Sequence, residues 1–253
     1  MLFGTRFADR TFSKKPTAAA VRTPELRGST GRRSSRSTLK DSNDGWKGCG
    51  RSLVSGRYVP KPLLRVWIPK SNGGQRPLGI PCISDRVVQM AAVLIIGPIF
   101  EADLLSQQYG FRPGLDAKMA LRRVYWHVTQ HGRREVVDAD LRGYFTSIPH
   151  SPLVRSLCRR IADGRMLHVI KGWLTAPVVE VIDGRPVQTT EARRTKRGTP
   201  QGGVISPLLA NLYFRRFLLA WHNHGHRDQL DAHVVTMPTI SSSAAAPAMP
   251  GRR

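Results

Sequence analysis

The sequence predicts an α+β fold in which helices pack on a small antiparallel sheet. Short stretches with alternating apolar residues flank tight-turn residues, as at Asn72-Gly73-Gly74 and Asp183-Gly184, which is typical of antiparallel hairpins. Longer stretches with helical spacing of apolar residues begin at capping residues such as Ser84 and Asp116. The hairpins and helices are mixed along the chain, without the regular strand-helix alternation of a parallel α/β sheet.

The composition predicts a polyanionic partner. The 253 residues include 40 Lys and Arg against 17 Asp and Glu, a net charge of +23. Nucleic acid is the leading candidate, and its binding should weaken steeply with salt. A membrane surface is the alternative, but the longest apolar stretch, Met90 to Phe100, is interrupted by Gly97 and Pro98, so we expect no membrane partner. Three scattered cysteines argue against a disulfide framework and a zinc site and fit a reducing compartment.

Residues 1–45 are rich in Ser, Thr, Arg and Gly and show no apolar period. This composition predicts a disordered basic N-terminal segment. Basic residues spaced among small ones also fit an organellar presequence. Basic disordered arms are the commoner case, so we expect a cytoplasmic protein of bacterial type rather than an organellar one.

Order is expected from Trp46 onward, beginning with a hairpin that ends near Gly79. Its first arm alternates apolar Leu64, Val66 and Ile68 with other residues. The two arms carry the cations Arg65, Lys70 and Arg76. Cations on both arms of a hairpin suit phosphate groups, although a hairpin with a merely decorated surface has the same pattern.

Four helices and a second hairpin are expected after this point. The first helix begins at Ser84, and its predicted buried residues are Val87, Val88, Ala91, Leu94 and Ile95. The other helices begin at Asp116, Ser151-Pro152 and Ser206-Pro207, and the last has an apolar stripe at Leu209, Leu212, Phe217, Ala220 and Trp221. The strands of the hairpin are expected at 178–182 and 187–189.

A strand from Glu135 carries two carboxylates, Asp138 and Asp140, on one side, because strand side chains alternate between faces. Two like charges side by side are unfavourable unless a cation or water offsets them. Magnesium prefers carboxylates together with substrate phosphates, so a metal site is one interpretation. A solvated strand end is the other.

A glycine-rich loop precedes the last helix. Gly202 and Gly203 follow Gln201 and leave backbone amides open to close approach by a ligand. By itself this is only a glycine-rich loop.

Together these segments resemble the reverse transcriptase of group II intron-encoded proteins, which also act as maturases. The blocks that carry the resemblance are, in order, Arg76 to Pro81, Asp85 to Gln89, Tyr109 to Gly114, Asp138 to Asp140 with Tyr144-Phe145, and Gly198 to Asn211. The resemblance covers about Gly56 to Trp221. It implies a right-hand polymerase with fingers over residues 46–134 and a partial palm over 135–232, copying an intron RNA template from a DNA primer with deoxynucleoside triphosphates.

The resemblance also implies the site residues. Asp140 would be the catalytic, metal-binding aspartate and Leu141 would offer its backbone carbonyl, in a site for two Mg²⁺ ions about 3.5 to 4 Å apart. The implied nucleotide-binding residues are Lys70, Arg76, Phe145, Gln201, Gly202 and Gly203, with Phe145 as an aromatic gate against the ribose 2′-hydroxyl. The implied template-binding residues are Arg65, Arg112 and Arg197.

The sequence departs from the family after Trp221, because the family's Tyr-Ala-Asp-Asp motif is missing. Residues 233–253 have low complexity and are expected to be disordered. Thr236 to Ala246 can be encoded so that the frame one base earlier reads Tyr-Ala-Asp-Asp-Phe-Val-Ile-Cys-Cys, which predicts a net one-base deletion before Met237. We therefore expect a truncated, catalytically defective enzyme. The alternatives are an RNA-binding splicing module without polymerase activity and a remnant without a role.

Overall fold

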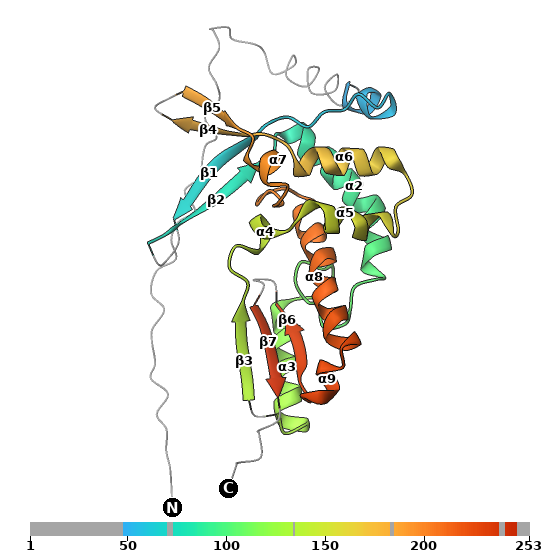
Figure 1. The fold of residues 1–253 in the computed structure, drawn as a ribbon, viewed down its shortest axis with the longest axis vertical. Helices are drawn as coiled ribbons and strands as arrows, with labels where there is room; N and C mark the ends of the chain where they lie inside the picture. The colour runs from blue at the N-terminus through green and yellow to red at the C-terminus, as the bar shows by residue number, and fades with distance from the viewer. Residues whose placement is uncertain (1–47, 70–72, 134, 183–184, 238–240, 247–253) are drawn as a thin grey trace, which may run out of the picture. The chain divides into compact units, whose positions relative to one another are not determined.

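The computed structural model describes residues 48–69, 73–133, 135–182, 185–237 and 241–246 (Figure 1). All of them belong to one compact unit within Asp41–Arg253. The expected disordered segment at 1–45, the turn residue Asn72 and the turn at 183–184 lie outside the described residues. The α+β class is confirmed, because the described residues form helices and two separate sheets.

The first sheet combines the two predicted hairpins. Strands β1 (Leu63–Pro69) and β2 (Gln75–Ile80) pair antiparallel, as do β4 (Val178–Ile182) and β5 (Arg185–Thr189). The strand order is β2-β1-β4-β5, and β1 runs parallel to β4, so this sheet is mixed rather than wholly antiparallel. The parallel pairing buries Leu63 against Val178. The fingers hairpin is thereby joined to a segment more than a hundred residues later in the chain.

The second sheet corrects the expectation of disorder at residues 233–236 and 241–246, whereas residues 238–240 and 247–253 lie outside the described residues. Strands β3 (Glu135–Asp140), β7 (Ser241–Ala246) and β6 (His233–Thr236) form an antiparallel sheet in this order. The side chains of Val234 and Val235 in β6 are buried. Strand β7 pairs on both sides through its backbone, which needs no particular side chains.

The helices largely follow the predicted starts. They are α2 (Ile83–Glu101), α3 (Ala117–Gln130), α4 (Tyr144–Ser147), α5 (His150–Cys158), α6 (Gly164–Leu174), α7 (Glu191–Thr195), α8 (Ser206–Asn223) and α9 (His226–Gln229). Asp116 caps α3 as expected, accepting a hydrogen bond from the Met119 amide at 2.7 Å. Cys82 rather than Ser84 occupies the N-cap position of α2. Helices α4, α6, α7 and α9 were not predicted.

Of the residues predicted to be buried in helix α2, Val88 is buried and the other four are exposed. The buried residues of this helix are Asp85, Val88, Gln89, Ala92, Ile96 and Phe100, whereas Val87, Leu94 and Ile95 are exposed. Apolar residues of α2 point to all sides of the helix, so their spacing in the sequence does not indicate which face is buried. By length and composition alone, α2 is also the one helix among the described residues that could span a membrane, a test that core helices pass as well.

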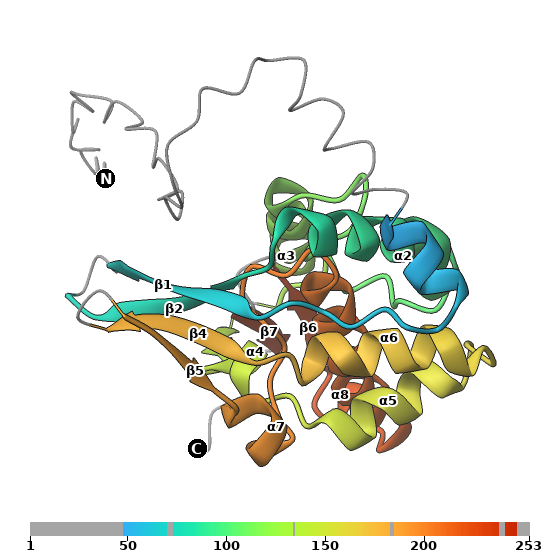
Figure 2. The ribbon, with the colours of Figure 1, turned by 90° about the horizontal axis from the view of Figure 1, so that it is seen from above.

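Helices α2, α5, α6 and α8 gather at one end of the four-stranded sheet (Figure 2). The side chains at which these helices meet form the main hydrophobic core, where Leu153, Leu157, Ile170 and Leu218 are fully buried. The fingers hairpin is anchored to this core by a polar chain at its base. The Tyr58 hydroxyl donates to buried Asp85 at 2.7 Å and accepts from the Trp173 indole at 3.0 Å.

Candidate nucleotide and template site

The fingers hairpin is tied to the glycine-rich loop by hydrogen bonds. The Arg76 Nε atom of β2 donates to the Gln201 side-chain oxygen at 2.8 Å. The Gly79 amide donates to the Gln201 carbonyl at 2.7 Å. Two residues predicted to bind the nucleotide, Arg76 and Gln201, are therefore in direct contact, although they lie far apart in the sequence.

The two glycines of this loop are required by close packing. Gly202 has φ +114°, and a Cβ atom there would lie 3.0 Å from the Gly79 carbonyl oxygen. A Cβ atom on Gly203 would lie 2.7 Å from Ser206 Oγ. The sequence suggested that these glycines admit a ligand. The structure adds that they admit the fingers strand and the first turn of α8.

The same loop holds the segment that follows the aspartate strand. The Thr199 amide donates to the Phe145 carbonyl at 2.7 Å, and the Gly198 amide donates to the Ile148 carbonyl at 2.8 Å. Helix α4, which contains Phe145, starts four residues after Asp140. Hydrogen bonds therefore connect the end of β3 through α4 and the loop to the fingers strand β2.

Asp140 is the last residue of β3, and its side chain is exposed, as is that of Asp138. The carboxylate is thus open to solvent and ligands rather than buried in the core. The carbonyl of Leu141, predicted to be a metal ligand, accepts a hydrogen bond from the Tyr144 amide at 3.2 Å. A carbonyl oxygen has two lone pairs, so one remains available.

A pocket of about 310 Å³ lies between the fingers hairpin and the loop. Its lining includes Arg65, Arg197 and Gln201, which are all predicted site residues. Arg65 forms an ion pair with Glu180 at 3.3 Å, and its guanidinium lies 5.8 Å from the centre of the Trp67 ring. Lys70, the remaining predicted cation of the hairpin, lies outside the described residues.

The predicted gate, Phe145, is half-buried between two aromatic rings. Phe111 meets it edge-on, with ring centroids 6.2 Å apart, and Phe111 itself adopts a positive φ of 53°. Non-glycine residues in this conformation are uncommon and cluster at functional sites. Beneath them Tyr144 donates its hydroxyl hydrogen to the Ala210 carbonyl at 2.8 Å, and burial raises its pKa.

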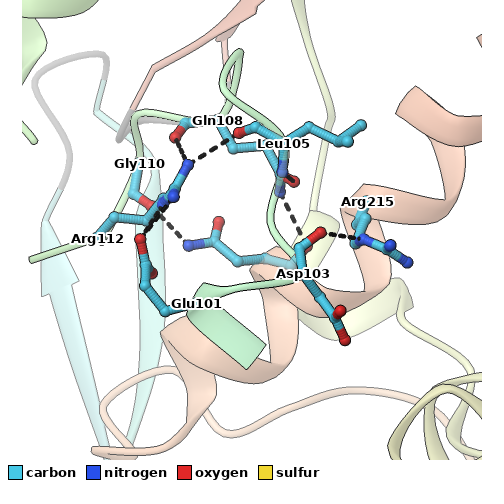
Figure 3. Close-up of polar contacts among 8 residues, drawn as sticks. Glu101, Asp103, Leu105, Gln108, Gly110, Arg112 and Arg215 are labelled. Atoms are coloured by element: carbon cyan, nitrogen blue, oxygen red, sulfur yellow. Dashed lines mark hydrogen bonds and ion pairs between the residues drawn. The ribbon is translucent and has the colours of Figure 1, made fainter. Parts of the chain in front are cut away.

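Arg112 has an intramolecular role (Figure 3). Its guanidinium donates to Glu101 at 2.7 Å and to the carbonyls of Leu105 and Gln108 at 2.8 Å each. Few of its donors are left for a ligand. Its predicted contact with the template stays a prediction, whereas the structure shows that it organises the loop after α2.

Sequence reasoning missed Gln89 as a site residue. This buried residue of α2 accepts a hydrogen bond from the Val204 amide at 2.8 Å through its side-chain oxygen. This hydrogen bond attaches the glycine-rich loop to helix α2. Gln89 and Phe111 both lie in segments that resemble the family. The sequence of these segments does not show that Gln89 contacts the glycine-rich loop or that Phe111 contacts the predicted gate Phe145.

The described residues do not fit a site for two metal ions. Asp140 and the Leu141 carbonyl could contribute to one site. Among the residues that the structure describes, no group of three His, Cys, Asp or Glu side chains could hold a metal ion. The sequence has no Asp or Glu after Asp231, so the connection between β6 and β7 supplies no carboxylate.

Comparisons with known proteins point to one family. Residues 68–235 match the family described as reverse transcriptase (RNA-dependent DNA polymerase). Protein YkfC of Escherichia coli is 41% identical over 168 residues, covering 65% of this chain and 42% of that protein. The group II intron-encoded protein LtrA of Lactococcus lactis is 34% identical over 186 residues, covering 71% of this chain and 29% of that protein. The chain thus spans less than half the length of these relatives.

Solved structures support the fold. A partial Cas6-RT-Cas1–Cas2 complex matches with a TM-score of 0.50 and 21% identity, covering 81% of this chain and 33% of that chain. Telomerase of Candida tropicalis in complex with a fragment of telomeric RNA matches with a TM-score of 0.53 and 10% identity, covering 83% of this chain and 40% of that chain.

Proposed function

This chain belongs to the reverse transcriptase family, and we propose that it forms the fingers and part of the palm of a group II intron-type enzyme. In this proposal the substrates are an RNA template paired with a DNA primer and an incoming deoxynucleoside triphosphate. The nucleotide is bound between the fingers hairpin and the glycine-rich loop. The observation that carries the proposal is the hydrogen bond between Arg76 and Gln201 beside a pocket whose lining includes Arg65 and Arg197.

The chemistry of the pocket supports these substrates. Arg65 and Arg197 place guanidinium groups on its lining, and such groups pair well with phosphate oxygens. Arg76 and, by resemblance, Lys70 would hold the triphosphate. Phe145 would exclude a ribose 2′-hydroxyl by its bulk, and its contact with Phe111 supports a fixed ring position.

We further propose that nucleotidyl transfer by this chain is severely reduced. A divalent metal supplies charge neutralisation and activates the attacking oxygen in this family. Asp140 alone cannot replace the family's paired carboxylates, because two cations repel one another without enough anionic ligands. Losing several kcal/mol of stabilisation would cost about tenfold in rate for each 1.36 kcal/mol.

The test uses the full chain with a fluorescent DNA primer annealed to an RNA template. We expect binding that falls steeply with salt, by roughly 0.7 to 0.9 log units per log salt unit for each phosphate contact. We expect extension of the primer on poly(rA) far below that of an intact relative. Arg76→Ala should weaken binding of the nucleotide, measured as the concentration of dTTP that stabilises the complex on a gel.

The matched control is Arg155→Ala, which removes an equal charge from the exposed surface of α5. This variant should keep the affinity for dTTP. Extension comparable to that of an intact relative would refute the claim of reduced catalysis. Equal loss of dTTP binding in the Arg76 and Arg155 variants would refute the assigned nucleotide site.

A second candidate is an RNA-binding splicing module without polymerase activity. The +23 net charge supports it, since binding to RNA requires no paired carboxylates. Salt-sensitive binding to intron RNA, with no effect of dTTP on the complex, would favour this candidate over the enzyme.

A further inference from the structure

Helix α3 has a broad face that no other described element covers. Its inner side, with buried Ala120 and His127, packs on β6 and β7 (Figure 1). On the outer side the exposed fraction is 70% for Tyr125 and 56% for Leu121. We call the outer residues the α3 face, and they are Lys118, Leu121, Arg122, Tyr125, Trp126 and Thr129, with Arg123 at the flank.

Helical geometry places these residues side by side. Positions three and four apart are neighbours on a helix surface, so Tyr125 stands next to Leu121, Arg122 and Thr129. Lys118 is one turn before Arg122. Helix α3 contains no Asp or Glu among its 14 residues, so none of these cations is neutralised within the helix.

The flank of the α3 face is already ordered. The Arg123 guanidinium lies 4.5 Å from the centre of the Trp126 ring, a cation–π contact. Trp126 also meets His131 edge-on, with ring centroids 4.2 Å apart. These contacts fix a planar cation and an aromatic ring at the flank of the α3 face.

We propose that the α3 face binds single-stranded RNA, as a surface separate from the pocket of the proposed polymerase site. Unpaired bases stack on exposed aromatic rings, while Lys and Arg side chains contact the phosphates. Tyr125 is the stacking platform, and Lys118 and Arg122, which precede it on the same face of the helix, hold the phosphate backbone. A duplex offers no exposed base faces, so it would use only the cations.

The choice of RNA rests on the proposed function, in which RNA is the single-stranded nucleic acid that the enzyme meets. A protein helix is the other conceivable occupant of a surface with Leu121 and Tyr125. The concentration of positive charge favours the nucleic acid, because an apolar protein interface is depleted of Lys.

The test measures binding of a fluorescent oligo(rU) to the full chain by anisotropy at about 0.2 M salt, where purely electrostatic binding is weakened. Tyr125→Ala should reduce the affinity by roughly 5- to 150-fold, the range expected for one stacked base. Tyr125→Phe keeps the ring and should retain the affinity. Ultraviolet crosslinking of oligo(rU), mapped by mass spectrometry, should label the peptide that contains Tyr125.

Controls separate the possible failures. Arg122→Ala should weaken oligo(rU) binding and lower its salt dependence, whereas Arg155→Ala on α5 should do neither. Binding of the primer–template duplex should be nearly unchanged in Tyr125→Ala, since paired bases offer no exposed faces for the ring to stack on. Unchanged oligo(rU) affinity in Tyr125→Ala, or equal loss with Arg155→Ala, would overturn the α3 face while leaving the proposed function in place. Loss of dTTP binding in Arg76→Ala but not in Arg155→Ala would continue to support the polymerase site.

Discussion

At the scale of single residues, the site depends on buried side chains that satisfy backbone groups of the glycine-rich loop. Gln89 is the clearest example, because its side-chain oxygen accepts from the Val204 amide at 2.8 Å and lies within 3.4 Å of the Ile205 nitrogen as well. A buried amide without a partner is costly, so this contact couples the stability of the loop to helix α2.

We predict that Gln89→Met lowers the free energy of unfolding by about 1 to 3 kcal/mol, because it keeps the side-chain shape but removes the acceptor. The looser loop should also bind dTTP more weakly in the presence of primer–template. Urea denaturation and the gel assay measure the two effects. Gln188→Met, at an exposed position of β5, should change neither quantity, and equal effects at both positions would argue against this role.

A histidine pair between α3 and β6 predicts sensitivity to acid. The ring of buried His127 stacks on that of His233, with centroids 4.4 Å apart. Burial, reinforced by His233, Arg123, Arg133 and His131, lowers the pKa of His127 to about 4. Burial also lowers the pKa of His233.

The sign follows from proton uptake. Between about pH 6.5 and 4 the unfolded chain binds a proton at His127 that the folded chain does not, so stability falls as the pH falls. The slope should be at most about 1.4 kcal/mol per pH unit for this one group. Urea denaturation at several pH values measures it. His127→Leu should flatten the profile, and an unchanged slope would show that this ring does not set the acid sensitivity.

At the scale of elements, the sequence predicted those helices and hairpins whose formation depends on neighbouring residues in the chain. Both hairpins of the first sheet were predicted from alternation and turn residues, and the start of α3 from its Asp116 cap. The parallel pairing of β1 with β4 was not predicted, because it depends on contacts between distant segments. Strand β7 was missed because Ser and Ala carry little β propensity, and pairing with both neighbours decides its conformation.

For the site residues too, some contacts were predicted from the sequence and others depend on the fold. The resemblance placed Arg76 and Gln201 in one site, and the structure brings them into contact. It could not separate an arginine that faces a ligand from one that organises a loop, as Arg112 does. That distinction depends on which acceptors the fold brings near the guanidinium, and these acceptors are carbonyls of an irregular segment.

The exposed side of α2 predicts self-association. The exposed fractions of Leu94 and Ile95 are 70% and 62%, and an apolar surface of this kind promotes aggregation. Leu94→Lys with Ile95→Lys should raise the soluble fraction and lower light scattering without loss of the cooperative unfolding transition. Ile96→Lys, at a position only 2% exposed, should abolish that transition. Unfolding caused by the first pair would show that this side is covered in solution.

At the scale of the whole molecule, the match to the family ends at residue 235, close to the point where the sequence departs from the family's pattern. We predict that the codon of Thr236 ends in T and that the codons from Met237 onward read Tyr-Ala-Asp-Asp in the frame one base earlier. Sequencing the gene checks this directly. A base other than T before the Met237 codon would contradict the proposed one-base deletion.

The shifted reading frame predicts how catalysis could be restored. In the frame one base earlier, the two aspartates of Tyr-Ala-Asp-Asp fall on the codons of Thr239 and Ile240, which lie outside the residues that the structure describes. Thr239→Asp with Ile240→Asp should therefore return the family's paired carboxylates and allow two magnesium ions to bind. We expect primer extension to rise by roughly 100-fold, equivalent to about 2.7 kcal/mol of barrier. Thr239→Asn with Ile240→Asn has similar shape without charge and should give no rise. Equal extension by the Asp and Asn variants would show that missing carboxylates are not what limits this chain.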